Sequence, residues 1–338
     1  MYKVALNFAD GKTLFCPILP NELLLDAALK SGIKIPLDCR EGVCATCQGR
    51  CESGSYTQDY VDEEALSEQD LAERRILSCQ TRVQSDASFY FDFDSSLCNS
   101  EGTTELVTTV KEVVHVSAST AILKITVEDQ TSLDYLPGQY ARLKIPGTDQ
   151  LRSYSFACAP GTPTLEFLVR LLPDGVMSNY LRDRCRPGDI IAMEAPLGAF
   201  YLRHIDRPVV MMAGGTGLSA FLGMLDQLAD KGGAGFPIHL YYGVRTEQDL
   251  CELQRLAAYT RTVEGFEFTP VLSEPHPDWQ GKRGFITDHL ARYEATDTPF
   301  DMYICGPPPM VDSIKQWHHK SGQTSARIYL EKFTQSNT

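Results

Sequence analysis

The chain has 338 residues, of which 43% are hydrophobic and 22% charged, so it is long enough for about two or three domains and is not a disordered chain. Lys and Arg number 31 against 44 Asp and Glu, and the formal net charge of −13 excludes nucleic acid as the main partner, because phosphate binding needs a basic face. No apolar run approaches the roughly 18 residues of a membrane span, and residues 1–8 lack the apolar core of a signal peptide. We therefore expect no membrane partner and a cytoplasmic location.

The spacing of the cysteines predicts an iron–sulfur cluster. The chain has 11 cysteines, and an odd number without a signal peptide indicates reduced thiols rather than disulfides. Cys39, Cys44 and Cys47 have the spacing C-x4-C-x2-C, and Cys79 follows later, a pattern typical of a plant-type [2Fe–2S] cluster. A zinc site and four unrelated buried thiols stay open as alternatives, although zinc ligands usually come as two close pairs. Cys51 fits no second pattern and is expected to be structural.

The segment around these cysteines predicts a small domain with strands and one helix. Residues 2–8 and 12–18 alternate apolar and polar side chains, as in a hairpin, and residues 21–29 have the pattern of a capped amphipathic helix. Two strands, a helix, a cysteine loop and further strands resemble the plant-type ferredoxin domain, a β-grasp fold, over residues 1–95. The small polar residues of 96–104 predict a linker to the next domain.

The segment 105–205 predicts an antiparallel barrel, because short alternating strands follow one another between turns. Arg152 and Tyr154 lie two residues apart on one strand, where they would offer a phosphate-binding fork and a flat stacking surface. That pair suits a flavin nucleotide, although such neighbours also occur on ordinary barrel faces. Gly175 then precedes a helix whose free N–H groups would hold a diphosphate, with the hydroxyl of Ser178 nearby.

These two motifs together resemble the ferredoxin–NADP⁺ reductase superfamily. The resemblance implies bound FAD, with Arg152 on its phosphates and Tyr154 stacked on its ring. It also implies that Ser155 reaches the reactive N5 edge, and that Gly175 and Ser178 bind the pyrophosphate.

The segment 206–338 predicts a parallel α/β domain, because buried apolar strands alternate with helical patterns. An apolar strand at 207–213 is followed at once by a glycine loop and a helix, an arrangement that binds nucleotide phosphates. The loop consists of Gly214, Gly215, Thr216 and Gly217. It lacks the G-x-G-x-x-G fingerprint, so a simple tight turn stays open as an alternative.

A second loop of this domain, C-G-P-P-P-M, begins at Cys305. Both loops resemble the pyridine-nucleotide signatures of the same superfamily, which implies that the glycine loop approaches the nicotinamide nucleotide and that Cys305 and Gly306 border the nicotinamide. Glu331 and Phe333 resemble the family's acid-x-aromatic end, in which the aromatic ring shields the flavin until nicotinamide displaces it. The resemblance thus implies catalytic roles for Ser155, Cys305, Glu331 and Phe333. The family more often has Tyr there and ends sooner, so ordinary core packing of Phe333 stays open.

The choice between NADH and NADPH is expected to lie after the second strand of this domain. Glu247 and Asp249 would repel a 2′-phosphate and bind ribose hydroxyls, whereas Arg245 would favour the phosphate. The two acids favour NADH.

Three redox groups in one chain predict an order of electron transfer. NADH gives a hydride, flavin holds two electrons and releases them singly, and a [2Fe–2S] cluster accepts one. The order ferredoxin, flavin, nucleotide resembles the reductase components of bacterial aromatic-ring oxygenases, most closely those of benzoate and toluate 1,2-dioxygenases. The resemblance implies a multidomain α+β and α/β chain, with a β-grasp ferredoxin domain, an antiparallel β-barrel flavin domain and a parallel α/β nucleotide-binding domain. It also implies a terminal oxygenase component as electron acceptor.

Two alternatives to this function stay open. One is the reductase of a phenol, xylene or methane monooxygenase, and the other is a deoxysugar-intermediate reductase or a redox-sensing module. The acidic segment 59–73 would steer a basic oxygenase surface or would simply form a solvated helix face.

Overall fold

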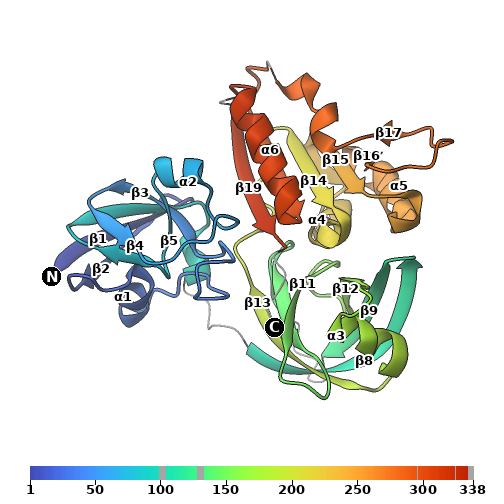
Figure 1. Cartoon of the computed structure of the whole chain (residues 1–338), viewed down its shortest axis with the longest axis horizontal. Helices are drawn as coiled ribbons and strands as arrows, with labels where there is room; N and C mark the ends of the chain where they lie inside the picture. The colour runs from blue at the N-terminus through green and yellow to red at the C-terminus, as the bar shows by residue number, and fades with distance from the viewer. Residues whose placement is uncertain (99–103, 128–132, 295, 324, 334–338) are drawn as a thin grey trace. The chain divides into compact units, whose positions relative to one another are not determined.

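The computed structural model describes residues 1–98, 104–127, 133–294, 296–323 and 325–333 (Figure 1). The chain forms two compact units, one of residues 1–104 with 197–199, the other of residues 105–196 with 200–338. Within the described ranges, no helix has the length and apolar character needed to cross a membrane.

The N-terminal unit contains a mixed sheet with one helix packed against it. Alternate residues of β1 are buried, among them Val4 and Leu6, because successive side chains of a strand point to opposite faces. The sheet order is β2-β1-β7-β3-β5, with β7 parallel to β1 and the other neighbours antiparallel. The strands of this unit are β1 (Tyr2–Phe8), β2 (Thr13–Ile18), β3 (Gln48–Ser53), β4 (Tyr56–Gln58), β5 (Arg75–Leu77), β6 (Thr81–Val83) and β7 (Ala87–Phe91). This arrangement fits the predicted β-grasp domain.

The first helix, α1 (Leu24–Lys30), begins later than its sequence pattern predicts. Asn21 has a left-handed φ of 62°, and the N-cap Leu23 offers no side-chain hydrogen bond. The carboxylate of Glu22 instead accepts hydrogen bonds from the backbone N–H of Leu19 and from the ammonium of Lys30. A turn closed by Glu22 therefore precedes the helix.

Two short helices complete this unit. The hydroxyl of Ser67 caps α2 (Glu68–Ala72) by accepting from the backbone N–H of Asp70. A 3₁₀ helix, η1 (Ser95–Cys98), follows the last strand, and its Ser95 donates to the carboxylate of Asp10. The middle of the predicted linker, residues 99–103, lies outside the described residues.

The second unit begins with the predicted antiparallel barrel, of sheet order β11-β10-β13-β8-β9-β12. A bridge between Phe156 and Phe167 joins the two outer strands, and the N–H of Ala157 donates to the carbonyl of Glu166 at 2.8 Å. The sheet therefore closes on itself around an apolar core. Its strands are β8 (Thr104–Ser117), β9 (Thr120–Val127), β10 (Tyr140–Lys144), β11 (Leu151–Ser155), β12 (Leu165–Arg170) and β13 (Ile190–Leu197).

The helix predicted after β12 is short. It consists of α3 (Val176–Asn179) followed by a π-helical turn, η2 (Tyr180–Arg184). The guanidinium of Arg182 donates to the carbonyls of Leu172 and Pro173, and so closes the turn that leads into α3.

The rest of the unit is a parallel sheet of order β17-β16-β15-β14-β18-β19. Every residue of β14 and β18 is buried, as expected for strands covered on both faces. The strands are β14 (Val209–Gly214), β15 (Gly233–Val244), β16 (Glu264–Leu272), β17 (Lys282–Arg283), β18 (Phe300–Gly306) and β19 (Ala326–Lys332). The helices are η3 (Gly215–Gly217), α4 (Leu218–Asp230), η4 (Glu247–Asp249), α5 (Leu253–Thr262), η5 (Ile286–His289), η6 (Ala291–Tyr293) and α6 (Pro308–Lys320).

The helix predicted from residue 284 is replaced by the two 3₁₀ turns η5 and η6. Gly284 has a left-handed φ of 93°, and the carboxylate of Asp288 accepts from the N–H of Phe285 at 2.8 Å. This cap closes a single turn rather than a continuous helix.

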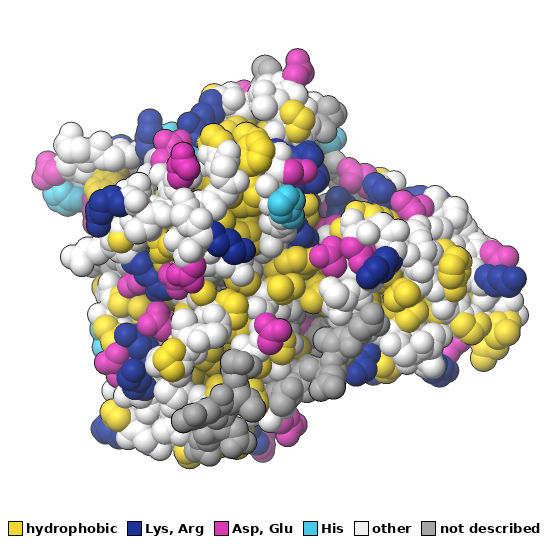
Figure 2. All heavy atoms as spheres, turned by 180° about the vertical axis from the view of Figure 1, so that it is seen from behind, with side chains coloured by type: hydrophobic (Ala, Val, Ile, Leu, Met, Phe, Trp, Pro, Cys, Tyr) yellow, Lys and Arg dark blue, Asp and Glu magenta, His cyan; other side chains and the backbone are white. Residues whose placement is uncertain are grey.

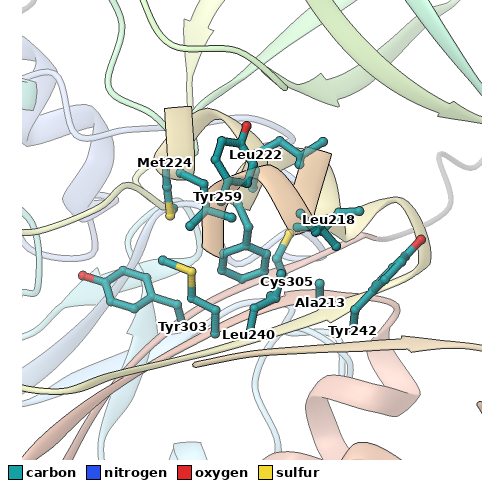
Figure 3. Packing of buried hydrophobic residues seen from close by; sticks show 14 of the residues in the cluster. Ala213, Leu218, Leu222, Met224, Leu240, Tyr242, Tyr259, Tyr303 and Cys305 are labelled. Atoms are coloured by element: carbon teal, nitrogen blue, oxygen red, sulfur yellow. The ribbon is translucent and has the colours of Figure 1, made fainter. Parts of the chain in front are cut away.

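The core of the α/β part lies between α4 and one face of the sheet (Figure 3). Leu218 and Leu222 of α4 face Leu240 and Tyr242 of β15, and all four side chains are fully buried. This packing fixes the start of α4 against the ends of the strands.

The strand order places a topological switch point between β14 and β18. The chain goes from β14 to β15 on one side and from β18 to β19 on the other. In open parallel sheets, ligands bind outside the carboxyl ends of the strands at this point. The glycine loop and the C-G-P-P-P-M loop lie at the carboxyl ends of these two strands.

Candidate functional site

The four predicted cluster ligands converge in two pairs within the N-terminal unit. The thiols of Cys39 and Cys44 shift each other's pKa, and so do those of Cys47 and Cys79, so the two members of each pair lie close together. The neighbouring Cys44 lowers the pKa of Cys39 to about 5, and the neighbouring Cys47 lowers the pKa of Cys79. Among the residues that the structure describes, no three His, Cys, Asp or Glu side chains are grouped for a single metal ion. Two thiol pairs suit a cluster in which two irons share four cysteine ligands.

The loop around these thiols has the tight backbone that a cluster site needs. Arg40, Gly42 and Ala45 all have left-handed φ angles, between 58° and 82°. A Cβ atom on Gly42 would collide with the carbonyl oxygen of Tyr60, so only glycine fits there. The N–H of Glu41 points at the sulfur of Cys39 at 3.3 Å, a contact that would stabilise a thiolate bound to iron.

In the second unit, the barrel and the α/β part together form one polar site. The hydroxyl of Ser155, at the end of β11, lies 3.3 Å from the carboxylate of Glu331 on β19. The sulfur of Cys305, at the end of β18, lies 3.9 Å from the same carboxylate. Burial and the neighbouring Glu331 raise the pKa of the Cys305 thiol, which therefore stays protonated. Three of the four predicted catalytic residues are thus brought together.

Phe333, the fourth, follows directly after β19. Its N–H donates to the carbonyl of Gly306 at 2.9 Å, and its half-buried ring packs against the core that contains Cys305. The ring therefore lies beside the C-G-P-P-P-M loop.

The two nucleotide loops meet backbone to backbone. A Cβ atom on Gly217 would collide with the carbonyl of Cys305, and one on Gly306 would lie 3.0 Å from the backbone of Gly214. A Cβ atom on Gly214 would lie 2.6 Å from the sulfur of Met310. The glycines are needed for this close approach of the two loops.

Arg152 and Tyr154, the predicted flavin residues of β11, lie two residues apart on the strand, as the alternating pattern predicts. Arg152 pairs with Leu143 of β10 in the register, and Tyr154 pairs with Ala141. The guanidinium of Arg152 donates to the side chain of Gln150 at 2.8 Å. The half-buried ring of Tyr154 packs against the barrel core, and burial raises the pKa of its hydroxyl. The two side chains therefore share one side of the barrel strand next to Ser155.

Gly175 and Ser178 shape the turn before α3. The hydroxyl of Ser178 accepts from the N–H of Leu172 at 2.9 Å and donates to the carbonyl of Arg170 at 3.3 Å. A Cβ atom on Gly175 would lie 2.8 Å from this hydroxyl. Both residues thus hold the loop whose N–H groups are predicted to bind the pyrophosphate.

Glu247 and Asp249 are already engaged by protein groups. One oxygen of Asp249 accepts from the N–H and hydroxyl of Thr246, at 3.1 and 2.9 Å, and the other accepts from Ser119 of the barrel at 2.6 Å. Both oxygens of Glu247 accept from the N–H of His276, at 2.9 and 3.2 Å. Asp249 therefore connects the barrel to the segment 245–249 that follows β15.

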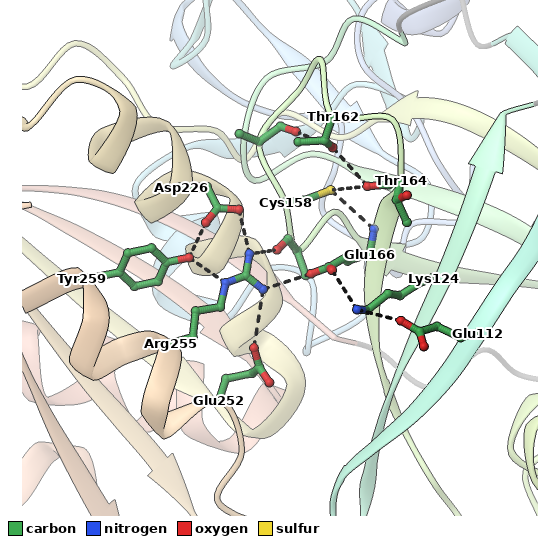
Figure 4. Close-up of polar contacts among 12 residues, drawn as sticks. Glu112, Lys124, Cys158, Thr162, Thr164, Glu166, Asp226, Glu252, Arg255 and Tyr259 are labelled. Atoms are coloured by element: carbon green, nitrogen blue, oxygen red, sulfur yellow. Dashed lines mark hydrogen bonds and ion pairs between the residues drawn. The ribbon is translucent and has the colours of Figure 1, made fainter. Parts of the chain in front are cut away.

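Sequence reasoning missed Arg255, which connects the same two parts (Figure 4). Its guanidinium donates to the carbonyl of Ala157 at 2.8 Å and to Glu166 at 3.1 Å, both in the barrel. It also donates to Asp226 of α4 at 2.7 Å and to Tyr259. No local pattern distinguishes this arginine from others on an amphipathic helix, because its partners in the barrel, Ala157 and Glu166, lie far away in the sequence.

A second residue that was missed is Arg170, at the end of β12. Its guanidinium is exposed and would lie 3.6 Å from a Cβ atom on Gly215 of the glycine loop. A charge that directly follows the apolar run F-L-V at the end of this strand is the signal that would have revealed it.

The acidic segment 59–73 is partly neutralised by the fold. Asp59 forms an ion pair with Arg82 at 2.7 Å, and Asp70 caps α2 and contacts Arg75 at 3.5 Å. On the face of the molecule that Figure 2 shows, acidic and basic side chains are interspersed.

Three family models match the chain in the predicted order. The first is described as a 2Fe-2S iron-sulfur cluster binding domain and matches residues 7–84. An oxidoreductase FAD-binding domain matches residues 107–201, and an oxidoreductase NAD-binding domain matches residues 211–316. The predicted cofactors and the order ferredoxin, flavin, nucleotide are therefore confirmed.

The chain also resembles known proteins over its whole length. It is 56% identical to the anthranilate 1,2-dioxygenase electron transfer component of Acinetobacter baylyi, covering 100% of this chain and 98% of that protein. It is 38% identical to the toluate 1,2-dioxygenase electron transfer component of Pseudomonas putida, covering 99% of each. Among solved structures, an Amycolatopsis cytochrome P450 reductase has a TM-score of 0.72 at 30% identity, covering 100% of both chains. The chain belongs to the family of electron transfer components of aromatic-ring 1,2-dioxygenases, which are oxidoreductases with fused 2Fe-2S, FAD-binding and NAD-binding domains.

Proposed function

We propose that this protein transfers electrons from NADH to the terminal oxygenase component of an anthranilate 1,2-dioxygenase. The observation that supports this substrate class is the identity of 56% to an anthranilate 1,2-dioxygenase electron transfer component over the whole chain. Identity to the toluate and 2-halobenzoate components is 38% and 37%. The higher identity over the whole chain favours the anthranilate system.

The geometry of the site supports these roles. Bound FAD would take a hydride from NADH and pass single electrons to the cluster. Cys39, Cys44, Cys47 and Cys79 would hold the cluster, because their thiols meet in two pairs. The proposed domains are 1–95 for the cluster, 105–205 for FAD and 206–338 for NADH, with a linker at 96–104.

The residues at the junction of the barrel and the α/β part would bind and orient the nicotinamide and flavin rings. Ser155 would donate to the N5 edge, with its proton shared with Glu331 at 3.3 Å. The protonated Cys305 would fill the space beside the nicotinamide without adding charge. Phe333 would cover the flavin face. Arg152, Tyr154, Gly175 and Ser178 would hold the flavin nucleotide, and the glycine loop with Gly306 would hold the nicotinamide nucleotide.

The charges after β15 and β16 favour NADH over NADPH. The segments 245–249 and 273–278 contain one arginine, Arg245, and four carboxylates, namely Glu247, Asp249, Glu274 and Asp278. This excess of negative charge would repel the dianionic 2′-phosphate of NADPH.

The acidic N-terminal unit would assist docking of the oxygenase. Residues 1–95 contain 16 acidic and 9 basic residues, a net charge of 9 − 16 = −7. Such a surface raises the rate of encounter with a basic partner. We also propose a cytoplasmic location, in keeping with 11 free cysteines.

The test reconstitutes the purified protein with NADH and one of two oxygenase components. One oxygenase comes from an anthranilate and the other from a toluate 1,2-dioxygenase, and product formation is measured with the matching substrate. We expect turnover with the first to exceed turnover with the second. Faster turnover with the toluate oxygenase would contradict the proposed substrate class. Failure with both, but turnover with the hydroxylase of a propane 2-monooxygenase, whose reductase is 31% identical, would favour a monooxygenase partner.

A further inference from the structure

Arg245 and Glu274 lie side by side where the adenosine end of the nucleotide is expected. Val244 and Leu272, the last residues of the neighbouring parallel strands β15 and β16, are register partners. Beyond them the backbones stay paired, because the N–H of Glu274 donates to the carbonyl of Arg245 at 2.8 Å. Both residues therefore lie just beyond the carboxyl ends of β15 and β16. Dinucleotides bind at this end of a parallel sheet.

The two side chains form an exposed ion pair. The Nε and Nη2 atoms of Arg245 lie 2.8 and 2.7 Å from the same carboxylate oxygen of Glu274. The side chains are 69% and 60% exposed, so a ligand can reach both. Exposed pairs add little to stability, so this pair can be changed without unfolding the domain.

The other two acids on the β15 side are less available to a ligand. Asp249 accepts three hydrogen bonds, one of them from Ser119 of the barrel. Glu247 is occupied by the N–H of His276. Glu274, by contrast, holds the arginine that sequence analysis identified as favouring a 2′-phosphate.

We propose that Glu274 determines the preference for NADH by occupying the guanidinium of Arg245. A free arginine beside the second strand of a nucleotide-binding sheet binds a 2′-phosphate with two parallel N–H donors. Glu274 engages the donors on one edge of the guanidinium, Nε and Nη2, and adds a negative charge that repels the phosphate. This inference rests on the proposed oxidation of NADH and names the residue that selects the nucleotide.

The test compares the wild type with Glu274→Gln, and the readouts are kcat/KM for NADH and for NADPH with ferricyanide as acceptor. We expect kcat/KM for NADPH to rise about tenfold, as for one gained hydrogen bond to a charged group, while kcat/KM for NADH stays within about twofold of the wild type. Calorimetry with 2′,5′-ADP and 5′-AMP gives a second readout without turnover. The affinity of the variant should rise for 2′,5′-ADP only.

Two further variants control for indirect effects. Glu267→Gln removes the carboxylate that pairs with Arg292 at 3.0 Å. This ion pair is similarly exposed and also involves β16, but it does not include Arg245. It should leave the nucleotide preference unchanged. Arg245→Gln combined with Glu274→Gln should abolish the gain in NADPH activity, because the phosphate ligand is then absent.

The outcomes separate this inference from the proposed function. If Glu274→Gln leaves both kcat/KM values and 2′,5′-ADP affinity unchanged in a wild type that prefers NADH, Glu274 is not the selecting residue and NADH oxidation still stands. If the double variant keeps the gain, Arg245 is not the phosphate ligand and the inference fails. A wild type that prefers NADPH would contradict the proposed use of NADH itself.

Discussion

The hydroxyl of Ser155 lies 3.3 Å from the carboxylate of Glu331, although 176 residues separate them in the chain. Ser155 ends a barrel strand, and Glu331 lies near the end of the last strand of the parallel sheet. The site is therefore built by the packing of two differently folded parts, and any change that shifts one part against the other should reduce hydride transfer.

Replacing Ser155 with alanine should slow reduction of the flavin. The variant loses the hydroxyl that donates to Glu331. Loss of one hydrogen bond to a charged group corresponds to a decrease of about tenfold or more in the rate of flavin reduction. Stopped-flow absorbance of the FAD-loaded protein with NADH measures the rate. Ser153→Ala changes an exposed serine on the same strand and should react like the wild type. Equal rates for both variants would exclude a role of Ser155 in the reaction.

Replacing Cys79 with serine should separate the two electron-accepting activities. Cys79 is proposed to close the cluster site from a segment remote from the cysteine loop, so the variant should lose or destabilise the cluster while the second compact unit stays folded. Ferricyanide takes electrons directly from flavin, and its reduction by NADH should persist. Reduction of cytochrome c and oxygenase turnover should fall sharply.

The wild type, assayed under the same conditions, is the control for each activity of the Cys79 variant. If ferricyanide reduction collapsed in a folded, FAD-loaded variant, the proposed order of electron transfer would be wrong. Oxygenase turnover without any cluster would show that electrons leave by another route.

Gly217→Ala should damage nucleotide binding. The added Cβ atom would collide with the carbonyl of Cys305, which is backbone and cannot rotate away. Overpacking of this kind costs about 1–3 kcal/mol, and we expect KM for NADH to rise about tenfold, in keeping with that energy. The wild type assayed under the same conditions is the control, because Gly232, which has open space around its Cβ position, has a left-handed φ of 75° and would be strained as alanine. An unchanged KM in Gly217→Ala would show that the two loops can separate without loss of the site.

Arg255→Met should destabilise the junction of the barrel with the α/β part. The arginine is only 21% exposed, and its removal leaves Asp226 and Glu166 without a shared cation. Breaking such a network costs about 3–5 kcal/mol when it is fully buried, so we expect a smaller loss in the free energy of unfolding here. Urea unfolding of the second unit, followed by its flavin fluorescence, measures this loss. Arg261→Met, on the exposed face of the same helix, should unfold like the wild type. Identical midpoints for both variants would show that the network adds nothing to stability.

Stability should decrease at alkaline pH because of buried thiols. Burial raises the pKa of Cys16 and of Cys251 from 9.0 to about 11. Above pH 9 the unfolded chain releases these protons while the folded chain keeps them, so the free energy of unfolding falls as pH rises toward 11. Denaturation midpoints across this range, in the wild type and in Cys251→Ala, measure the effect. The variant should lose less stability per pH unit, and an equal loss would assign the alkaline sensitivity to other groups.

The sequence by itself determined the cofactor classes and their order, because each of those signals is local. The spacing of Cys39, Cys44 and Cys47 follows from the size of a cluster loop, and the glycine loop follows from the close approach of backbone to nucleotide. Strand periodicity likewise predicted the barrel and the parallel sheet. A strand with one buried face alternates apolar and polar residues, whereas a strand buried on both faces is a continuous apolar run. These features need no knowledge of distant partners.

Only the tertiary structure decided which distant side chains meet. It paired Cys47 with Cys79, engaged Asp249 with Ser119, and placed Glu274 on Arg245. The later start of α1 and the two turns after Gly284 have a local cause instead, because the carboxylates of Glu22 and Asp288 accept from nearby N–H groups, which apolar periodicity does not record. Periodicity reports which face of an element is buried, whereas hydrogen-bond partners from other elements are set by packing. For that reason the ion pair of Arg245 with Glu274, to which we assign the choice of nucleotide, depends on the neighbouring strands β15 and β16.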